Sequence, residues 1–139
     1  MCKTLIWAVV SYGCESWTLD KETEKRLQAF EMKTLRRMLG LKSQEYRTNE
    51  SILQETSYTR QLVPNIKKRK LRYVGHISRK DESLEKTIMQ GGVEGKRGRG
   101  RPRRTWMNDV TEWTSLSVHE VTRKVKNRQE WRKIVKNAA

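Results

Sequence analysis

Two clusters of basic residues carry the clearest chemical signal in this sequence. One cluster, within residues 67–72, has five Lys or Arg residues in six positions, and the other, within residues 96–104, has six; neither contains an acidic residue. Lys and Arg neutralise phosphates and release counterions, so such clusters are typical of nucleic-acid-binding proteins. The residues that we expect to contact RNA or DNA are Lys67, Lys68, Arg69, Arg72, Arg79, Lys96, Arg97, Arg99, Arg101, Arg103 and Arg104.

Residues 96–104 fit several modes of binding. Arg99-Gly100-Arg101-Pro102 matches the core of an AT-hook, which lies extended in the narrow minor groove of A·T-rich DNA. Arg- and Gly-rich segments also bind RNA and single strands without that preference, and nuclear-import signals have a similar composition. The segment has nothing apolar to bury, so we expect an exposed flexible loop that contacts nucleic acid.

Residues for catalysis are not apparent. Two-metal nucleotidyl transfer needs carboxylates that converge on the metal ions, whereas Asp20, Asp81 and Asp109 are widely separated and are interpreted as caps or surface residues. His76 and His119 are the only histidines, and neither has a recognisable catalytic partner. We therefore expect a non-enzymatic chain with no catalytic residues, no metal and no cofactor.

Composition supports a polyanionic partner. The 139 residues include 31 Lys or Arg against 16 Asp or Glu, which gives a formal charge of +15. Cys2 and Cys14 are too few for a disulfide framework or a zinc knuckle. No run approaches the roughly 18 to 20 apolar residues of a membrane span. We expect RNA or DNA as the partner, and neither a membrane nor a small-molecule substrate. The expected location is the nucleus, with the cytoplasm as a second location.

Helices are the elements that would position these side chains. One is predicted to follow Asp20, a good N-cap, and to stop near Gly40. Its expected buried face consists of Leu27, Phe30, Leu35 and Met38. A short helix is predicted over residues 49–55 and a longer one over 63–79. The buried side of the longer helix would hold Leu62, Ile66, Tyr73, Val74 and Ile77, and the opposite side Lys68, Arg72 and Arg79.

The C-terminal part is predicted to form a helical pair. Thr105 would cap a helix with an apolar stripe of Trp106, Val110 and Trp113. A capping box from Ser117 to Glu120 would open one last helix, in which Val118, Val121, Val125, Trp131 and Val135 share a broad face. Tryptophans that recur with aliphatic neighbours favour core packing over base stacking.

Several segments, taken in order, resemble the C-terminal region of endonuclease–reverse transcriptases of non-LTR (LINE-type) retrotransposons. They are residues 12–17 (YGCESW), 27–31 (LQAFE), 35–40 (LRRMLG), 69–76 (RKLRYVGH), 98–102 (GRGRP) with Trp106, and 128–132 with Glu130-Trp131-Arg132. The resemblance implies that residues 5–40 are similar to the polymerase thumb and that the rest grips template RNA or target DNA. The metal-binding aspartates of the palm and the endonuclease are absent, and Asn127 stands where an acidic residue is expected.

These observations predict a mostly α fold. The expected units are a thumb-like helical segment (1–45), a basic helical segment (46–90), a flexible Gly/Arg-rich loop (91–104) and a C-terminal helical pair (105–139). The leading functional interpretation is a nucleic-acid-binding fragment of an RNA-directed DNA polymerase. The alternatives are a stand-alone AT-hook-like chromatin-binding protein and a helical protein-interaction module whose basic stretch serves nuclear import.

Overall fold

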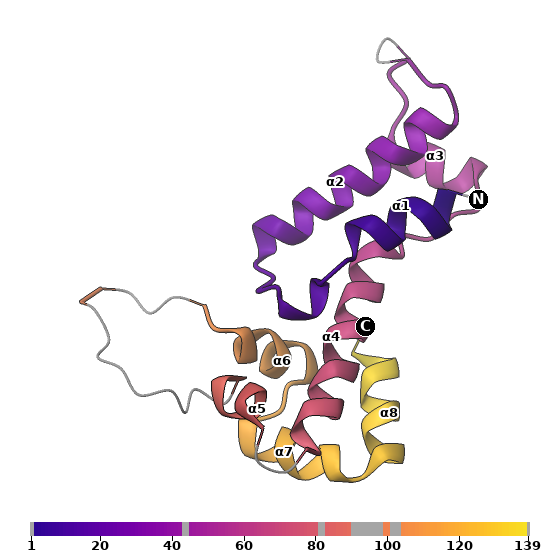
Figure 1. The fold of residues 1–139 in the computed structure, drawn as a ribbon. Coiled ribbons are helices and arrows are strands. Elements are labelled where there is room, and N and C mark those ends of the chain that lie inside the picture. The colour runs from indigo at the N-terminus through magenta and orange to yellow at the C-terminus, as the bar shows by residue number, and fades with distance from the viewer. Residues whose placement is uncertain (1, 43–44, 81–82, 90–98, 101–103, 139) are drawn as a thin grey trace.

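The computed structural model describes residues 2–42, 45–80, 83–89, 99–100 and 104–138, and within these ranges it contains helices and no strand, as a mostly α fold requires (Figure 1). An upper arm contains α1 (Cys2–Val10), the short 3-10 helix η1 (Cys14–Ser16), α2 (Lys21–Met38) and α3 (Asn49–Glu55). A lower bundle contains α5 (Leu84–Met89), α6 (Trp106–Thr114), α7 (Val118–Lys126) and α8 (Arg128–Asn137). The long α4 (Leu62–Ser78) connects the two parts.

The ends of the first two predicted helices are confirmed. Asp20 caps α2 by accepting a hydrogen bond from the backbone N–H of Thr23 at 2.7 Å. Gly40 follows the helix with φ of 66°, a left-handed conformation that suits glycine. Helix α3 has the predicted bounds and is capped by Thr48, whose hydroxyl accepts from the Ser51 N–H.

The predicted buried face of α2 is partly wrong. Leu35 is buried, but Met38 is 53% exposed and Phe30 is 38% exposed. Glu31 lies on the inner face instead, fully buried. Its carboxylate accepts hydrogen bonds from the Tyr58 hydroxyl and from two backbone N–H groups at the start of α4, and these bonds join α2 to the α3–α4 connection.

Helix α4 begins at Leu62, one residue before its predicted start, and it belongs to two hydrophobic clusters. In the upper arm, Leu62 and Ile66 pack with Cys14 and Leu19. In the lower bundle the cluster consists of Leu71, Val74, Val110, Val121, Val125, Trp131 and Val135. One helix therefore contributes to the cores of both parts of the molecule.

The expected single C-terminal helix is two helices. Asn127 ends α7 and caps α8, because its side chain accepts hydrogen bonds from the N–H groups of Gln129 and Glu130. The capping box of Ser117 and Glu120 is confirmed at the start of α7. Thr105 occupies the N-cap position of α6, but its side chain makes no capping hydrogen bond. The break lets α8 fold back along α4 (Figure 1).

The core role of the tryptophans is confirmed. Trp131 is 3% exposed, and its indole N–H donates to the Leu71 carbonyl at 3.0 Å. Trp106 and Trp113 are partly buried against the same cluster, and the Trp106 N–H donates to the Glu15 carbonyl. Among the described helices, none is both long and apolar enough to span a bilayer.

Candidate nucleic-acid interface

A basic groove of about 690 Å³ runs between α4 and α8. Its lining residues, which we call the α4–α8 groove, are Lys68, Arg72, Arg79, Arg128, Trp131, Arg132, Val135 and Lys136. Three of the cations are the ones predicted on the outer side of α4. The other three come from α8, and neither their position in the groove nor their role was predicted, because only the tertiary fold places α8 beside α4.

Each helix presents its cations as a row. On α8, Arg128, Arg132 and Lys136 are four residues apart, which is about 6 Å along a helix axis per step. On α4, Lys68 and Arg72 have the same spacing, and Arg79 lies two helical turns beyond Arg72. The groove therefore offers two parallel lines of positive charge rather than a single charged point.

Gly75 sets the distance between the two rows. A Cβ atom at this position would lie 2.5 Å from Trp131 Nε1 and 2.6 Å from Trp131 Cδ1, closer than real Cβ atoms come. The missing side chain lets the indole reach the α4 backbone and donate to Leu71. The sequence signal was a glycine in the middle of a helical pattern, which often marks a close approach.

The groove cations lack acidic partners. None of the six forms an ion pair with an acidic residue in the described part of the chain, although Arg79 donates to the Val125 carbonyl at 3.1 Å. The pKa of Arg79 lies below its ordinary value because its guanidinium is partly buried and because Arg128 and Arg132 repel its charge. Mutual repulsion in one groove favours the binding of an anion.

The rest of the basic run on α4 is paired with acidic residues, although the run itself contains none. Lys67 Nζ lies 2.9 Å from a carboxylate oxygen of Glu24, and Arg69 lies 2.9 Å from Glu15. Both acids come from other elements of the upper arm, which local sequence does not reveal. Lys67 and Arg69 were predicted to contact nucleic acid, and the structure gives them a bridging role within the protein.

Lys70 and Asp109 form a buried pair that corrects the interpretation of Asp109 as a cap or surface residue. Both side chains are fully buried and ion-paired, and Lys70 Nζ also donates to the Trp17 carbonyl at 2.7 Å. Asp109 further accepts from the Leu19 N–H at 2.8 Å and from Arg104 Nε at 2.7 Å. Burial lowers the pKa of Lys70, and the hydrogen bond and charge of Asp109 oppose that shift. The pair joins α4 and α6 to the upper arm.

The second predicted basic cluster is described only in part. Arg104 forms ion pairs with Asp109 and Glu112, so its guanidinium is engaged within the protein. Arg99 is exposed. The remaining predicted contacts of this cluster, Lys96, Arg97, Arg101 and Arg103, lie outside the described residues, as does Pro102 of the AT-hook-like motif.

The described residues do not form a metal site or bring the two histidines together. No group of three or more His, Cys, Asp or Glu side chains in that part of the chain could hold a metal ion. His76 and His119 are both exposed and lie on different helices, α4 and α7. Cys14 is a free, buried cysteine, and burial raises the pKa of its thiol.

Comparison with known proteins gives one informative result. No protein-family model matches the chain, and no solved structure matches it. The chain is 22% identical, over 152 aligned positions, to a transposon-derived protein of Caenorhabditis elegans whose own function is uncharacterised. The similarity indicates a transposon origin. It covers 96% of this chain, which spans about half, 52%, of that relative's length.

Proposed function

We propose that the chain binds RNA or DNA through the α4–α8 groove and acts as the nucleic-acid-gripping C-terminal region of a non-LTR retrotransposon reverse transcriptase, without an active site of its own. The observation that carries the proposal is that six cations from two helices face one groove with no acidic partner in the described chain. The similarity to a transposon-derived protein supports the retrotransposon origin.

The groove would bind the sugar-phosphate backbone. Cations in two rows can each meet a phosphate, and release of the condensed counterions supplies the binding free energy without reading sequence. Trp131 and Val135 form the floor, but Trp131 is 3% exposed and its N–H is engaged by Leu71. The floor therefore positions the cations and offers no aromatic face on which a base can stack.

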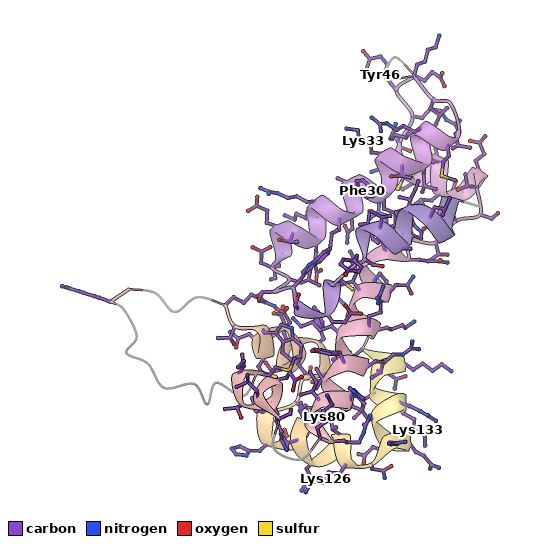
Figure 2. All side chains as sticks on the ribbon, viewed as in Figure 1. Phe30, Lys33, Tyr46, Lys80, Lys126 and Lys133 are labelled. Atoms are coloured by element: carbon purple, nitrogen blue, oxygen red, sulfur yellow. The ribbon has the colours of Figure 1, made fainter. Side chains whose placement is uncertain are left out.

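A matched pair of triple variants tests this proposal. The groove variant carries Lys68→Gln, Arg72→Gln and Arg132→Gln. The control carries Lys25→Gln, Lys33→Gln and Arg37→Gln, which removes the same charge from exposed residues of α2. Figure 2 shows Lys33 on the upper arm, well away from α8, where Lys133 lies.

Binding to a labelled oligonucleotide is measured by fluorescence anisotropy. If each lost phosphate contact is worth about 0.5 kcal/mol, the groove variant binds about tenfold more weakly than the unaltered chain. The α2 control keeps nearly full affinity. Equal losses in the two variants would contradict the groove as the binding site, since they would reflect net charge alone. Loss of affinity only after replacement of Arg99 and Arg101, and only on A·T-rich duplex, would favour the AT-hook-like alternative.

A further inference from the structure

A second hollow, between α4 and α1, adjoins the α4–α8 groove. We propose that this hollow receives a nucleobase and that the polymer bound along α4 is therefore single-stranded there. This inference rests on the proposed function, because the base is the one carried by the backbone that the groove cations hold. It goes further than the proposed function because it assigns a base-binding subsite and specifies that the bound nucleic acid is single-stranded.

The two hollows are neighbours on α4. Lys68 and Arg72 line both of them, so a chain whose phosphates meet these two cations lies beside both hollows. The second hollow has a volume of about 300 Å³, at the lower end of the range for small-ligand pockets. Its lining residues are Trp7, Ala8, Ser11, Leu62, Asn65, Lys68, Arg69 and Arg72.

The chemistry of the lining changes along α4. The α4–α8 groove has six cations around a buried floor, whereas the second hollow adds the half-buried indole of Trp7 and the exposed methyl group of Ala8. Asn65 is an exposed member of the lining, and its side chain makes no hydrogen bond within the described residues. An amide offers both a donor and an acceptor, which is what the edge of a base requires.

Arg69 joins the two helices that line the hollow. Its guanidinium is held by Glu15 and donates to the Ser11 hydroxyl at 2.7 Å, which links α4 to the end of α1. An aromatic surface and a free amide beside phosphate-binding cations are the components of single-strand sites. In a duplex the faces of a base are stacked and its pairing edge is occupied, so neither component could be used.

The length of α4 that lines the two hollows sets the expected size of the site. This stretch runs from Asn65 to Arg79, which are 14 residues apart, so it is about 21 Å long. At about 3.4 Å per stacked nucleotide this length corresponds to about six nucleotides, within the range of known single-strand sites.

Abasic oligonucleotides separate the base subsite from the phosphate groove. Anisotropy titrations of the full chain use an eight-nucleotide DNA strand, a strand of the same length with abasic sites, and a duplex of the same sequence. The variants are Asn65→Ala and the control Gln54→Ala, which removes an exposed amide from α3. Trp7 is left intact because its ring packs against Phe30 and against the hydrophobic cluster of the upper arm that contains Leu62 and Ile66.

We expect the normal strand to bind about five- to hundredfold more tightly than the abasic one. Asn65→Ala should weaken binding of the normal strand about two- to tenfold and leave the abasic strand unaffected. Gln54→Ala should change neither. Equal affinity for normal and abasic strands, or tighter binding of the duplex than of the single strand, would overturn the base subsite and leave the groove proposal standing. If none of the three oligonucleotides shows salt-dependent binding, both the base subsite and the groove proposal are overturned.

Discussion

Replacing Gly75 with alanine places a methyl group in the contact between α4 and α8. The new Cβ would lie 2.5 Å from Trp131 Nε1, whereas ordinary contacts begin at 3.4 Å, so the indole must move by about 0.9 Å. A shift of that size disrupts the hydrogen bond that Trp131 donates to Leu71 at 3.0 Å. Because the indole is buried, its N–H would be left without a partner.

Two effects of opposite sign compete in this substitution. Helix propensity and the lower entropy of the unfolded chain favour alanine by about 1 kcal/mol. Overpacking costs about 1 to 3 kcal/mol, and an unsatisfied buried donor costs about 1 to 3 kcal/mol more. The structure therefore predicts a net destabilisation of about 1 to 5 kcal/mol, and the sign alone distinguishes the close contact from simple propensity.

Urea unfolding, followed by circular dichroism, measures this free energy. His76→Ala, on the neighbouring exposed position of α4, is the control and should change stability by less than about 0.5 kcal/mol. In a Trp131→Phe background, which removes the indole N–H, the penalty of Gly75→Ala should shrink by about 0.5 kcal/mol or more. A Gly75→Ala variant that is more stable than the unaltered chain would refute the packing described between α4 and α8.

Two further predictions use the same unfolding assay. Asp109→Asn leaves Lys70 buried without a counter-charge and should lower the free energy of unfolding by about 3 to 5 kcal/mol. The double variant Lys70→Met with Asp109→Leu should lower it far less. Equal losses of stability in the two variants would contradict the buried pair. Hydrogen bonds from Thr23 lower the pKa of Asp20, so its stabilising effect is present above its unfolded pKa and is lost as the pH falls through the folded value. The difference in stability between the unaltered chain and Asp20→Ala should therefore be clear at pH 7 and shrink below about pH 4; a difference that does not change with pH would contradict it.

Local signals in the sequence were sufficient for the helices that carry their own caps. The bounds of α3, the Asp20 cap and the row of Lys68, Arg72 and Arg79 follow from spacing over a few residues. The break at Asn127 also had a local signal, an Asn followed three residues later by Glu, but the continuous apolar face obscured it.

The features that the sequence did not reveal depend on contacts between distant segments. Asp109 reads as a surface residue because its partners, Lys70 and Leu19, lie 39 and 90 positions away. For the same reason the acids that pair with Lys67 and Arg69 were not found. Helix periodicity identifies which side of α4 is polar, but whether a cation on that side is paired or free is decided by what packs beside it, and only the fold determines that.

The salt dependence of binding tests the central claim most directly. If the groove neutralises six phosphates of a duplex, the logarithm of affinity should fall with the logarithm of salt with a slope of about −5, and on a single strand of about −4. Removing the charges of Lys68, Arg72 and Arg132 should make the duplex slope shallower by about 3, while the α2 control keeps the slope of the unaltered chain. A groove variant with the full slope would contradict the assignment of the α4–α8 groove as the nucleic-acid interface.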